Sequence, residues 1–519
     1  MNADHTVRDT RALRLMMNLR EMERSREDYW RSHPGTSPTK LRWRALTVRH
    51  AFHVLPGESI LELGAGSGLW TTHLTDVLRG ENPITAAVLN GELAAQAAAR
   101  NLTNVAIARI DDISRDLAPE SFDYVVGTAI LCHAEYGLNL EALYRLLKPG
   151  GQILFFEANF WNPQVFVKSV VPPIGRLAGN APSQIGMRKY RLLQETSRQG
   201  FTNVEIIPYD ILHARTPRRM IPAVQSAAYL MERLPAVREL CGTLYIWARK
   251  PGAATGRRSQ ASLACHRDLF GSTSIVVPCR NEAATIPGLV AALTETYGEY
   301  IHEIILVDDC SEDGTSAVVE EIARMDPRVK VLVRQPPPGV GRALRDGYAA
   351  ATGRYVLSMD CDFAVIVPEL RDLFDVIAAG KDGAIGSRFS HDSILVNYPL
   401  AKILANRSFH LLLRRVTHLP VRDISNNLKL YRRTILDDLD IVEDGFAANA
   451  EIGLAPFLNG YGVEEIPISW IDRTPEMGRT SFNILKAAPG YWRVLMRVSL
   501  QARAARSQAA ERQRESPHR

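Results

Sequence analysis

The segment from Tyr355 to Asp362, which reads YVLSMDCD, constrains this chain most. A short apolar run predicts a buried β-strand, and it ends abruptly in Asp360, Cys361 and Asp362. Residues two apart on a strand point to the same side, so both carboxylates are expected at its carboxyl end, where open α/β sheets bind ligands. Paired carboxylates together with substrate phosphates commonly hold Mg²⁺ or Mn²⁺. The segment therefore predicts a metal site, with a surface turn rich in aspartate as the alternative.

The length of 519 residues exceeds what one hydrophobic core usually serves, so two domains are expected. A net charge of +5 is too small for this length to indicate nucleic-acid binding. The six cysteines form no CxxC pair, which argues against a zinc site or a disulfide framework and favours a reducing, cytoplasmic compartment. The amino terminus lacks the apolar core of a secretory signal, and no uncharged apolar run approaches the length of a membrane span.

A strand followed by a glycine-rich loop is also expected in the first half of the chain. The apolar segment 59–63 predicts a strand that runs into Gly64, Gly66 and Gly68 and then into a helix over 69–78. Glycines let the backbone turn sharply and approach a ligand closely at a helix amino terminus. A dinucleotide fingerprint would need a further glycine where this chain has Leu69, so the pattern argues against NAD or FAD.

The pattern E-x-G-x-G-x-G in this loop resembles motif I of the class I S-adenosylmethionine-dependent methyltransferases. The segments 107–112, 121–126 and 146–156 resemble further strands of that family, and their order fits a doubly wound parallel sheet. The resemblance implies S-adenosyl-L-methionine as cofactor. It implies a cofactor site made by Glu62, Gly64, Gly66, Gly68, Asn90, Asp111 and Asp112.

This half departs from the family at the end of its second strand. The family usually has an acidic residue there that grips the ribose hydroxyls, whereas this chain has Val88, so Asn90 or Glu92 would have to substitute. His133, after the fourth strand, is a candidate catalytic residue, although a lone histidine is more often structural. Methyl transfer from a sulfonium needs mainly alignment, so a missing base would not prevent the reaction.

The second half repeats the design of an apolar strand that ends in polar residues. These residues follow in the order Pro278, Glu282, Asp308, Asp309, Asp360, Arg388 and Asp423. Several of the carboxylates fall just beyond predicted strand ends, in the crevice where ligands are expected. For Arg388, which directly follows an apolar strand and Gly-Ser, phosphate binding is favoured over a solvated basic face.

This series, which spans nearly all of residues 273–482, resembles the family 2 glycosyltransferases of the GT-A fold and, among them, the dolichyl- or polyprenyl-phosphate sugar synthase branch. The resemblance implies inverting transfer from a nucleotide-diphosphate sugar, with Mg²⁺ or Mn²⁺ held by Asp360 and Asp362. It implies a donor site made by Pro278, Glu282, Asp308, Asp309, Gly341, Asp360, Arg388, Arg473 and Arg479. Arginines suit phosphate oxygens because of the guanidinium fork.

Two departures from that branch lie near the expected meeting point of donor and acceptor. Ala364 stands where the branch usually has a glutamine that contacts the metal. The family segment D-x-T-S-G-F reads DISNNL here, with Asn426 and Asn427 at its centre. The first departure removes one expected metal contact, and both weaken the inference of the acceptor class from the resemblance.

The nature of the acceptor decides whether a general base is needed. A phosphate-monoester acceptor is anionic near neutral pH and needs none, whereas a hydroxyl acceptor does. Asp423 and Glu451 are the candidate bases, with helix capping or ion pairing as the alternative for both. The segments 400–421 and 483–506 are expected either as amphipathic helices on an anionic membrane or as core helices with solvated arginines.

Together these observations predict an α/β chain of two enzymatic domains, a Rossmann-like methyltransferase sheet followed by a GT-A fold. The expected parts are a helical cap (1–50), the methyltransferase domain (51–250), a linker (251–272), the glycosyltransferase domain (273–500) and a disordered tail (501–519). We expect sugar transfer to a lipid-phosphate, glycan or small-molecule acceptor, methylation in the same pathway, and a cytoplasmic protein that at most lies on the inner face of a membrane. The alternatives are an inactive methyltransferase-like scaffold and a nucleotide-sugar hydrolase.

Overall fold

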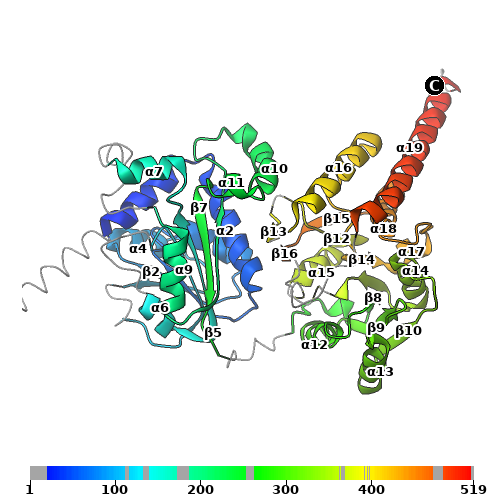
Figure 1. Ribbon diagram of the computed structural model, residues 1–519, viewed down its shortest axis with the longest axis horizontal. Coiled ribbons are helices and arrows are strands. Elements are labelled where there is room, and N and C mark those ends of the chain that lie inside the picture. Colours follow the sequence, from blue (N-terminus) through cyan, green and yellow to red (C-terminus); the bar gives the residue numbers. More distant parts are fainter. Residues whose placement is uncertain are drawn as a thin grey trace, which may run out of the picture. The chain divides into compact units, whose positions relative to one another are not determined.

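The computed structural model describes residues 20–110, 116–131, 140–171, 186–252, 262–361, 363, 367, 369–390, 392–393, 395–396, 398–471 and 483–515. Contacts divide the chain into two compact units, Met1–Ser259 and Gln260–Arg519. Figure 1 colours the first unit from blue to green and the second from green to red.

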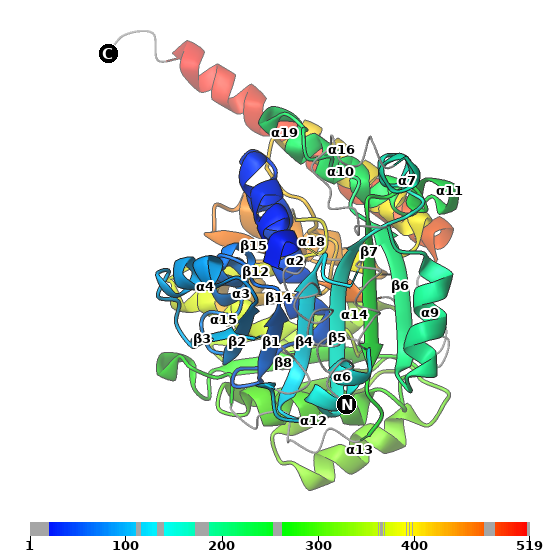
Figure 2. The same cartoon turned by 90° about the vertical axis from the view of Figure 1, so that its left-hand side faces the viewer.

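The first unit is built on a seven-stranded sheet in the order β3-β2-β1-β4-β5-β7-β6, whose strands lie side by side in Figure 2. Neighbouring strands are parallel except that β7 runs antiparallel to β5 and β6. The strands are β1 (Ile60–Leu63), β2 (Ile84–Val88), β3 (Val105–Arg109), β4 (Phe122–Thr128), β5 (Leu147–Ala158), β6 (Thr202–Tyr209) and β7 (Thr243–Arg249). Ile60 packs into one core and Leu61 and Leu63 into another, so β1 is buried on both faces, and Glu62 is its one polar residue.

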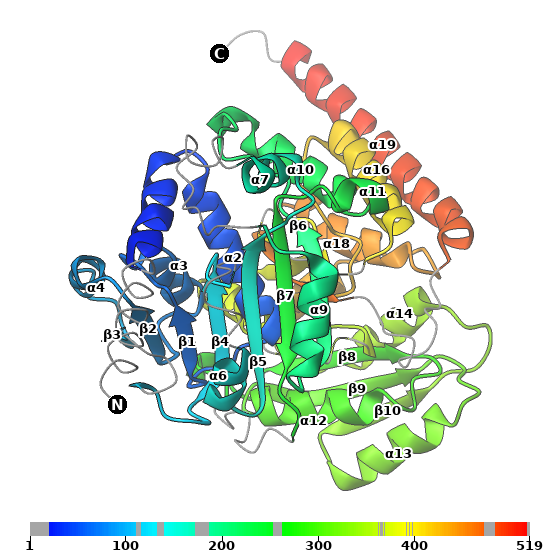
Figure 3. The same cartoon turned by 60° about the vertical axis from the view of Figure 1, so that its left-hand side comes forward.

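Helices pack against this sheet. They are a helical segment over 20–32, α2 (Ser37–Phe52), α3 (Leu69–Val77), α4 (Gly91–Ala98), α6 (Leu140–Leu146), α7 (Pro163–Val170), α9 (Lys189–Arg198), α10 (Ile221–Met231) and α11 (Pro235–Arg238). Figure 3 shows α9 along β6, against which it packs. Trp30 and Leu41 join the core around Trp70 and Phe156, so the first helices are anchored by apolar contacts.

The second unit has its own seven-stranded sheet, in the order β10-β9-β8-β11-β14-β12-β15. Only β14 runs antiparallel to its neighbours, β11 and β12. The strands are β8 (Thr273–Cys279), β9 (Ile301–Asp308), β10 (Val329–Val333), β11 (Tyr355–Ser358), β12 (Gly383–Ser387), β14 (Lys429–Arg432) and β15 (Val463–Pro467), and a separate pair is formed by β13 (Leu395–Val396) and β16 (Trp470–Ile471). The YVLSM run thus forms the central strand β11, as the sequence predicted.

The helices of the second unit include two long ones that pack against each other, α16 and α19 (Figure 3). The helices are α12 (Ile286–Tyr297), α13 (Thr315–Met325), α14 (Val340–Ala350), α15 (Leu370–Ala378), α16 (Leu400–Thr417), α17 (Arg433–Asp437), α18 (Ala448–Leu458) and α19 (Ile484–Glu515). Residues 501–515, expected in a disordered tail, are helical because α19 continues through a run of alanine, arginine, glutamine and glutamate, which all favour helix. None of the helices among the described residues is long and apolar enough to cross a membrane.

Candidate active sites

The polar residues of the second unit gather at one edge of its sheet. β8, β9, β11 and β12 all run in the same direction and end there, at Cys279, Asp308, Ser358 and Ser387. Because β14 runs the opposite way, its amino-terminal end reaches the same edge and brings the segment 423–428 with it. The carboxyl edge of a mostly parallel sheet is the usual place for a ligand crevice.

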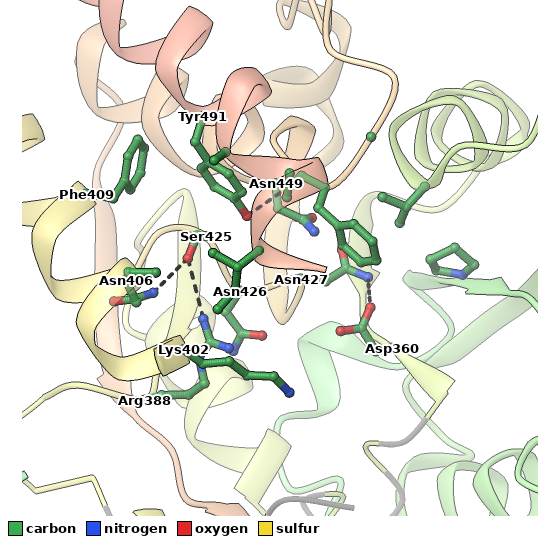
Figure 4. Close-up of a pocket in the computed structure, with 18 of the residues that line it drawn as sticks. Asp360, Arg388, Lys402, Asn406, Phe409, Ser425, Asn426, Asn427, Asn449 and Tyr491 are labelled. Atoms are coloured by element: carbon green, nitrogen blue, oxygen red, sulfur yellow. Dashed lines mark hydrogen bonds between the residues drawn. The ribbon is translucent and has the colours of Figure 1, made fainter. Parts of the chain in front are cut away.

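A carboxylate and an amide meet at the centre of this edge (Figure 4). Asn427 donates a hydrogen bond from Nδ2 to Asp360 Oδ1 at 2.9 Å, and Asp360 lines a cavity of about 570 Å³. Asn427 Oδ1 is buried and has no hydrogen-bond partner among the described residues. Carboxylate and amide oxygens are suitable ligands for Mg²⁺ or Mn²⁺, so these donors fit the expected ion. Asp362 lies outside the described residues.

Arg388 lines the same cavity as Asp360 and is surrounded by a carboxylate and aromatic rings. Asp423 accepts from Arg388 Nε at 2.7 Å and from Nη2 at 2.9 Å, and the guanidinium carbon lies 5.6 Å from the ring centre of Trp470 and 5.8 Å from that of Tyr398. Burial alone would raise the pKa of Asp423, but the charge of Arg388 outweighs it and lowers that pKa well below its usual value. Such a carboxylate is a weak base, and it orients Arg388 toward the cavity.

The opposite wall of the cavity is apolar and comes from α16 and α19. Phe409 and Leu412 contribute from α16, and Tyr491, Trp492 and Leu495 from α19. Figure 4 shows Phe409 and Tyr491 across the cavity from Asp360. The remaining residues of the lining include Pro278, Arg280, Glu282, Asp309, Val340, Lys402, Asn406, Ser425, Asn426, Phe446, Asn449, Ile484, Ala487 and Ala488. One cavity therefore joins a charged end to a long apolar wall.

Among the expected donor residues, Pro278, Glu282, Asp309, Asp360 and Arg388 line this cavity. Two of them also hold neighbouring loops. Asp309 accepts from Gly339 N at 2.7 Å and pairs with Arg334, and Glu282 accepts from Thr285 Oγ1 at 2.6 Å. Arg473 and Arg479 lie outside the described residues.

The structure places three other expected residues away from the cavity lining. Asp308 is fully buried and accepts from the N–H of Ser311 at 3.0 Å. Gly341 packs so tightly that a Cβ would lie 2.2 Å from the carbonyl oxygen of Glu443. Glu451 accepts from the N–H of Glu443 at 2.8 Å and pairs with Arg497 of α19. These contacts favour structural roles for all three.

Lys429, on β14, also lies at this edge and was not predicted from the sequence. It is fully buried and donates to the carbonyl oxygen of Asn426. Burial lowers its pKa to about 7, although the nearby charges of Asp423 and Asp360 act in the opposite direction. The available signal was a lysine between Leu428 and Leu430, at the start of a strand.

The glycine-rich loop of the first unit has the geometry that the sequence predicted. Gly64, Gly66 and Gly68 have φ of 66°, 59° and 77°, in the left-handed region that favours glycine. The loop joins β1 to α3 at the point where the chain order of the sheet reverses, between β1 and β4. Ligands bind at such switch points in open α/β sheets.

The other expected cofactor residues differ in what they do. Glu62 is buried, and burial raises its pKa to about 7. Asn90 caps α4 by accepting from the N–H of Glu92 at 2.9 Å, and Glu92 itself is exposed beside Arg24 at 3.8 Å. The three remaining predicted residues, Asp111, Asp112 and His133, lie outside the described residues.

Comparison with known proteins agrees with this division. Residues 61–155 match a methyltransferase domain, and residues 274–440 match the glycosyl transferase family 2. The second unit is similar to a polyprenol monophosphomannose synthase of Mycolicibacterium smegmatis, with 29% identity over 228 residues that cover 42% of this chain and 83% of that protein. The chain therefore carries a methyltransferase domain followed by a family 2 glycosyltransferase domain, as predicted from the sequence.

Solved structures resemble each half. Glucosyl-3-phosphoglycerate synthase from Mycobacterium tuberculosis, in complex with phosphoglyceric acid, is 18% identical with a TM-score of 0.36, and the match covers 49% of this chain and 85% of that one. Phosphoethanolamine N-methyltransferase 2 of Haemonchus contortus, in complex with S-adenosyl-L-methionine, is 18% identical with a TM-score of 0.30, and the match covers 40% of this chain and 52% of that one.

Proposed function

We propose that the second domain transfers a sugar from a nucleotide-diphosphate sugar to a lipid phosphate. The observation that carries this proposal is a cavity in which Asp360 and Arg388 face an apolar wall made by α16 and α19. The charged end suits a diphosphate, and the apolar wall suits a hydrocarbon chain. The proposal agrees with the similarity to a polyprenol monophosphomannose synthase.

The donor's diphosphate would lie at the sheet edge. Asp360 and Asp362 would hold Mg²⁺ or Mn²⁺, which neutralises charge on the leaving nucleoside diphosphate. Asn427 fixes the Asp360 carboxylate, and Arg388 supplies a fixed positive charge where negative charge develops as the bond from the sugar's anomeric carbon to the diphosphate oxygen breaks. Pro278, Glu282, Asp309, Arg473 and Arg479 complete the proposed donor site.

The acceptor class follows from the state of the two candidate bases. Asp423 is held by Arg388, and Glu451 by Arg497, so both carboxylates are engaged in ion pairs. A phosphate oxygen is already anionic and can attack the anomeric carbon without giving up a proton, whereas a hydroxyl needs a base. The geometry therefore favours a phosphate acceptor over a glycan hydroxyl.

The outer faces of α16 and α19 suit a membrane-bound acceptor. Leu411 is 66% exposed, Leu485 84% and Leu500 61%. The segments 400–417 and 484–500 contain lysines and arginines but no acidic residue. Exposed apolar side chains among cations are typical of helices that lie on anionic lipid. We propose that this face rests on a membrane surface from which the lipid phosphate enters the cavity.

For the first domain we propose S-adenosylmethionine-dependent methyl transfer in the same pathway. The loop with three left-handed glycines would hold the cofactor, and the buried Glu62 lies in β1 just before that loop. In this reaction the methyl group moves from the cofactor's sulfonium to a nucleophile, and alignment supplies most of the rate enhancement. An inactive scaffold is the second candidate, because Val88 leaves the ribose site without its usual acid.

The donor proposal is tested by thermal stabilisation of the full chain with UDP, GDP and dTDP, each with and without Mn²⁺. We expect one nucleotide to raise the melting temperature only with Mn²⁺, and we expect Asp360→Ala to abolish the shift. Asp437→Ala is the matched control, since Asp437 is 62% exposed, lies 3.9 Å from Arg433 and does not line the cavity. If no nucleotide shifts the wild-type protein with Mn²⁺, the proposal is wrong.

A further inference from the structure

The helical segment over 20–32 places three charged side chains directly on the glycine-rich loop. Glu23 and Glu27 are 2% and 5% exposed, and the Arg26 side chain is 10% exposed. All three point at backbone groups of the loop or of neighbouring strand ends. Buried charges on a surface helix require an explanation, because burial is costly unless their partners are good.

The two carboxylates accept hydrogen bonds from backbone N–H groups of the loop and of the residues that follow β2. Glu23 accepts from Gly66 N at 3.2 Å, from Leu89 N at 3.1 Å and from Asn90 N at 2.8 Å. Glu27 accepts from the N–H of Ser67 at 3.2 Å and from its hydroxyl. These donors lie at the ends of β1 and β2, where a bound cofactor would need them.

The guanidinium of Arg26 donates hydrogen bonds to backbone carbonyl groups at the ends of β1 and β4. Its Nη1 donates to Thr128 O at 3.0 Å, and its Nη2 donates to Gly64 O. A Cβ on Gly64 would lie 2.7 Å from Arg26 Nη2, and a Cβ on Gly66 would lie 2.9 Å from Glu27 Oε2. The helix therefore fills space that the glycines leave open.

These contacts resemble the ones that the carboxylate and ammonium groups of an amino acid would make with the same backbone groups. Carboxylate oxygens lie on the N–H donors and a cation lies on the carbonyl acceptors, as the carboxylate and ammonium of an S-adenosylmethionine molecule would require. On the basis of the methyltransferase function proposed above, we propose that the helix over 20–32 is an internal plug of the cofactor site. Glu23, Arg26 and Glu27 compete with the cofactor, which binds only when the helix withdraws.

The plug is tethered so that it can return. Trp30 packs in the core with Trp70 and Leu41, at the end of the helix away from Glu23. The apparent cofactor affinity then equals the intrinsic affinity multiplied by the fraction of molecules in which the site is open. Weakening the plug should therefore tighten cofactor binding, which is the opposite of what a cofactor-binding role for these side chains predicts.

The test is calorimetric titration of the full chain with S-adenosylhomocysteine. We expect the double variant Glu23→Ala/Glu27→Ala to bind at least about tenfold more tightly than the wild type, a change of about 1.4 kcal/mol. Alanine keeps the helix propensity, so the segment remains helical. Asp28→Ala is the matched control on the same helix: Asp28 is an exposed carboxylate, and its loss should leave the affinity unchanged.

The outcomes separate the plug from the function on which it rests. Weaker binding by the double variant would mean that Glu23 or Glu27 supplies a cofactor contact, and it would overturn the plug while keeping the cofactor. Absence of binding by every form of the protein would reject the cofactor itself, and the plug with it.

Hydrogen exchange on the wild-type chain gives a second readout that needs no variant. Adding S-adenosylhomocysteine should speed exchange of the amides of residues 20–32 while slowing exchange at Gly66 and Ser67. Slower exchange over 20–32 would show that the helix closes over the ligand, and it would overturn the proposal.

Discussion

The ion pair between Arg388 and Asp423 gives the sharpest prediction for the second domain. Asp423→Asn keeps the shape of the side chain and removes the charge that faces the guanidinium. The Arg388 side chain is only 12% exposed, so its charge would then lack its partner in a largely water-excluded site. Removing one member of a buried pair costs about 3–5 kcal/mol, which is roughly 6–20 °C in the melting temperature of a domain of this size.

The assay is hydrogen exchange of the full chain during stepwise heating, because peptides of β14 and α16 then report the second unit separately from the first. Replacing both partners by apolar residues, Arg388→Met with Asp423→Leu, should cost less than the sum of the single changes, since no unpaired charge remains. A shift below about 2 °C for Asp423→Asn, or additive costs in the double variant, would refute the pairing argument. Lost sugar transfer at unchanged stability would instead identify Asp423 as the base.

Three further predictions follow from the buried groups. Between about pH 7 and 10, Lys429 is protonated in the unfolded chain and neutral in the folded chain. The free energy of unfolding of the wild type relative to Lys429→Met should therefore rise by up to about 1.4 kcal/mol per pH unit in this range. A pH-independent difference would contradict this. The pKa of Glu62 is raised to about 7, so the stability of the wild type relative to Glu62→Gln should fall as pH rises from about 4 to 7, and a rising difference would show the sign to be wrong. Gly341→Ala should lower the free energy of unfolding by about 1–3 kcal/mol, because its Cβ would meet a backbone carbonyl at 2.2 Å, whereas Gly288→Ala in α12, with open space around it, should not destabilise the protein.

The strands and loops could be predicted because their signals are local. The run before Asp360 and the run before Gly64 are buried strands in both units, and an apolar run bounded by polar or glycine-rich turns carries that information within ten residues. The two-domain α/β organisation followed from the same signals. The order of the motifs along the chain therefore identified both domains without any knowledge of tertiary contacts.

The pairings within each site could not be read in the same way. Asp360 and Asn427 are 67 residues apart, and they meet because β14 is antiparallel within an otherwise parallel sheet. Glu23 and Gly66 are 43 residues apart, and nothing in a charged amphipathic helix indicates which backbone groups it will contact. The sequence identified the residue types of each site, whereas the roles of Asp423 as an orienting group and Glu451 as a loop anchor depend on long-range contacts.

No local sequence pattern indicates that one cavity spans both the charged sheet edge and the apolar helices. Its apolar wall comes from α16 and α19, and β14, α17, α18, β15 and β16 lie between these two helices along the chain. The sequence left open whether these helices belong to the core or to a membrane face. In the fold α16 has a buried side with Ile403 and Leu413 and an exposed side with Leu411, and Leu485 of α19 is exposed as well.

The most direct test of the account is sugar transfer by the full chain to polyprenyl phosphate and to the matching polyprenol, in vesicles of anionic lipid with Mn²⁺ and the nucleotide sugar selected by thermal stabilisation. We predict that the phosphate accepts sugar and the alcohol does not, that Asp360→Ala abolishes transfer, and that Asp437→Ala retains it. Equal transfer to the polyprenol, or transfer that survives Asp360→Ala, would contradict the proposed acceptor and the proposed metal site, respectively.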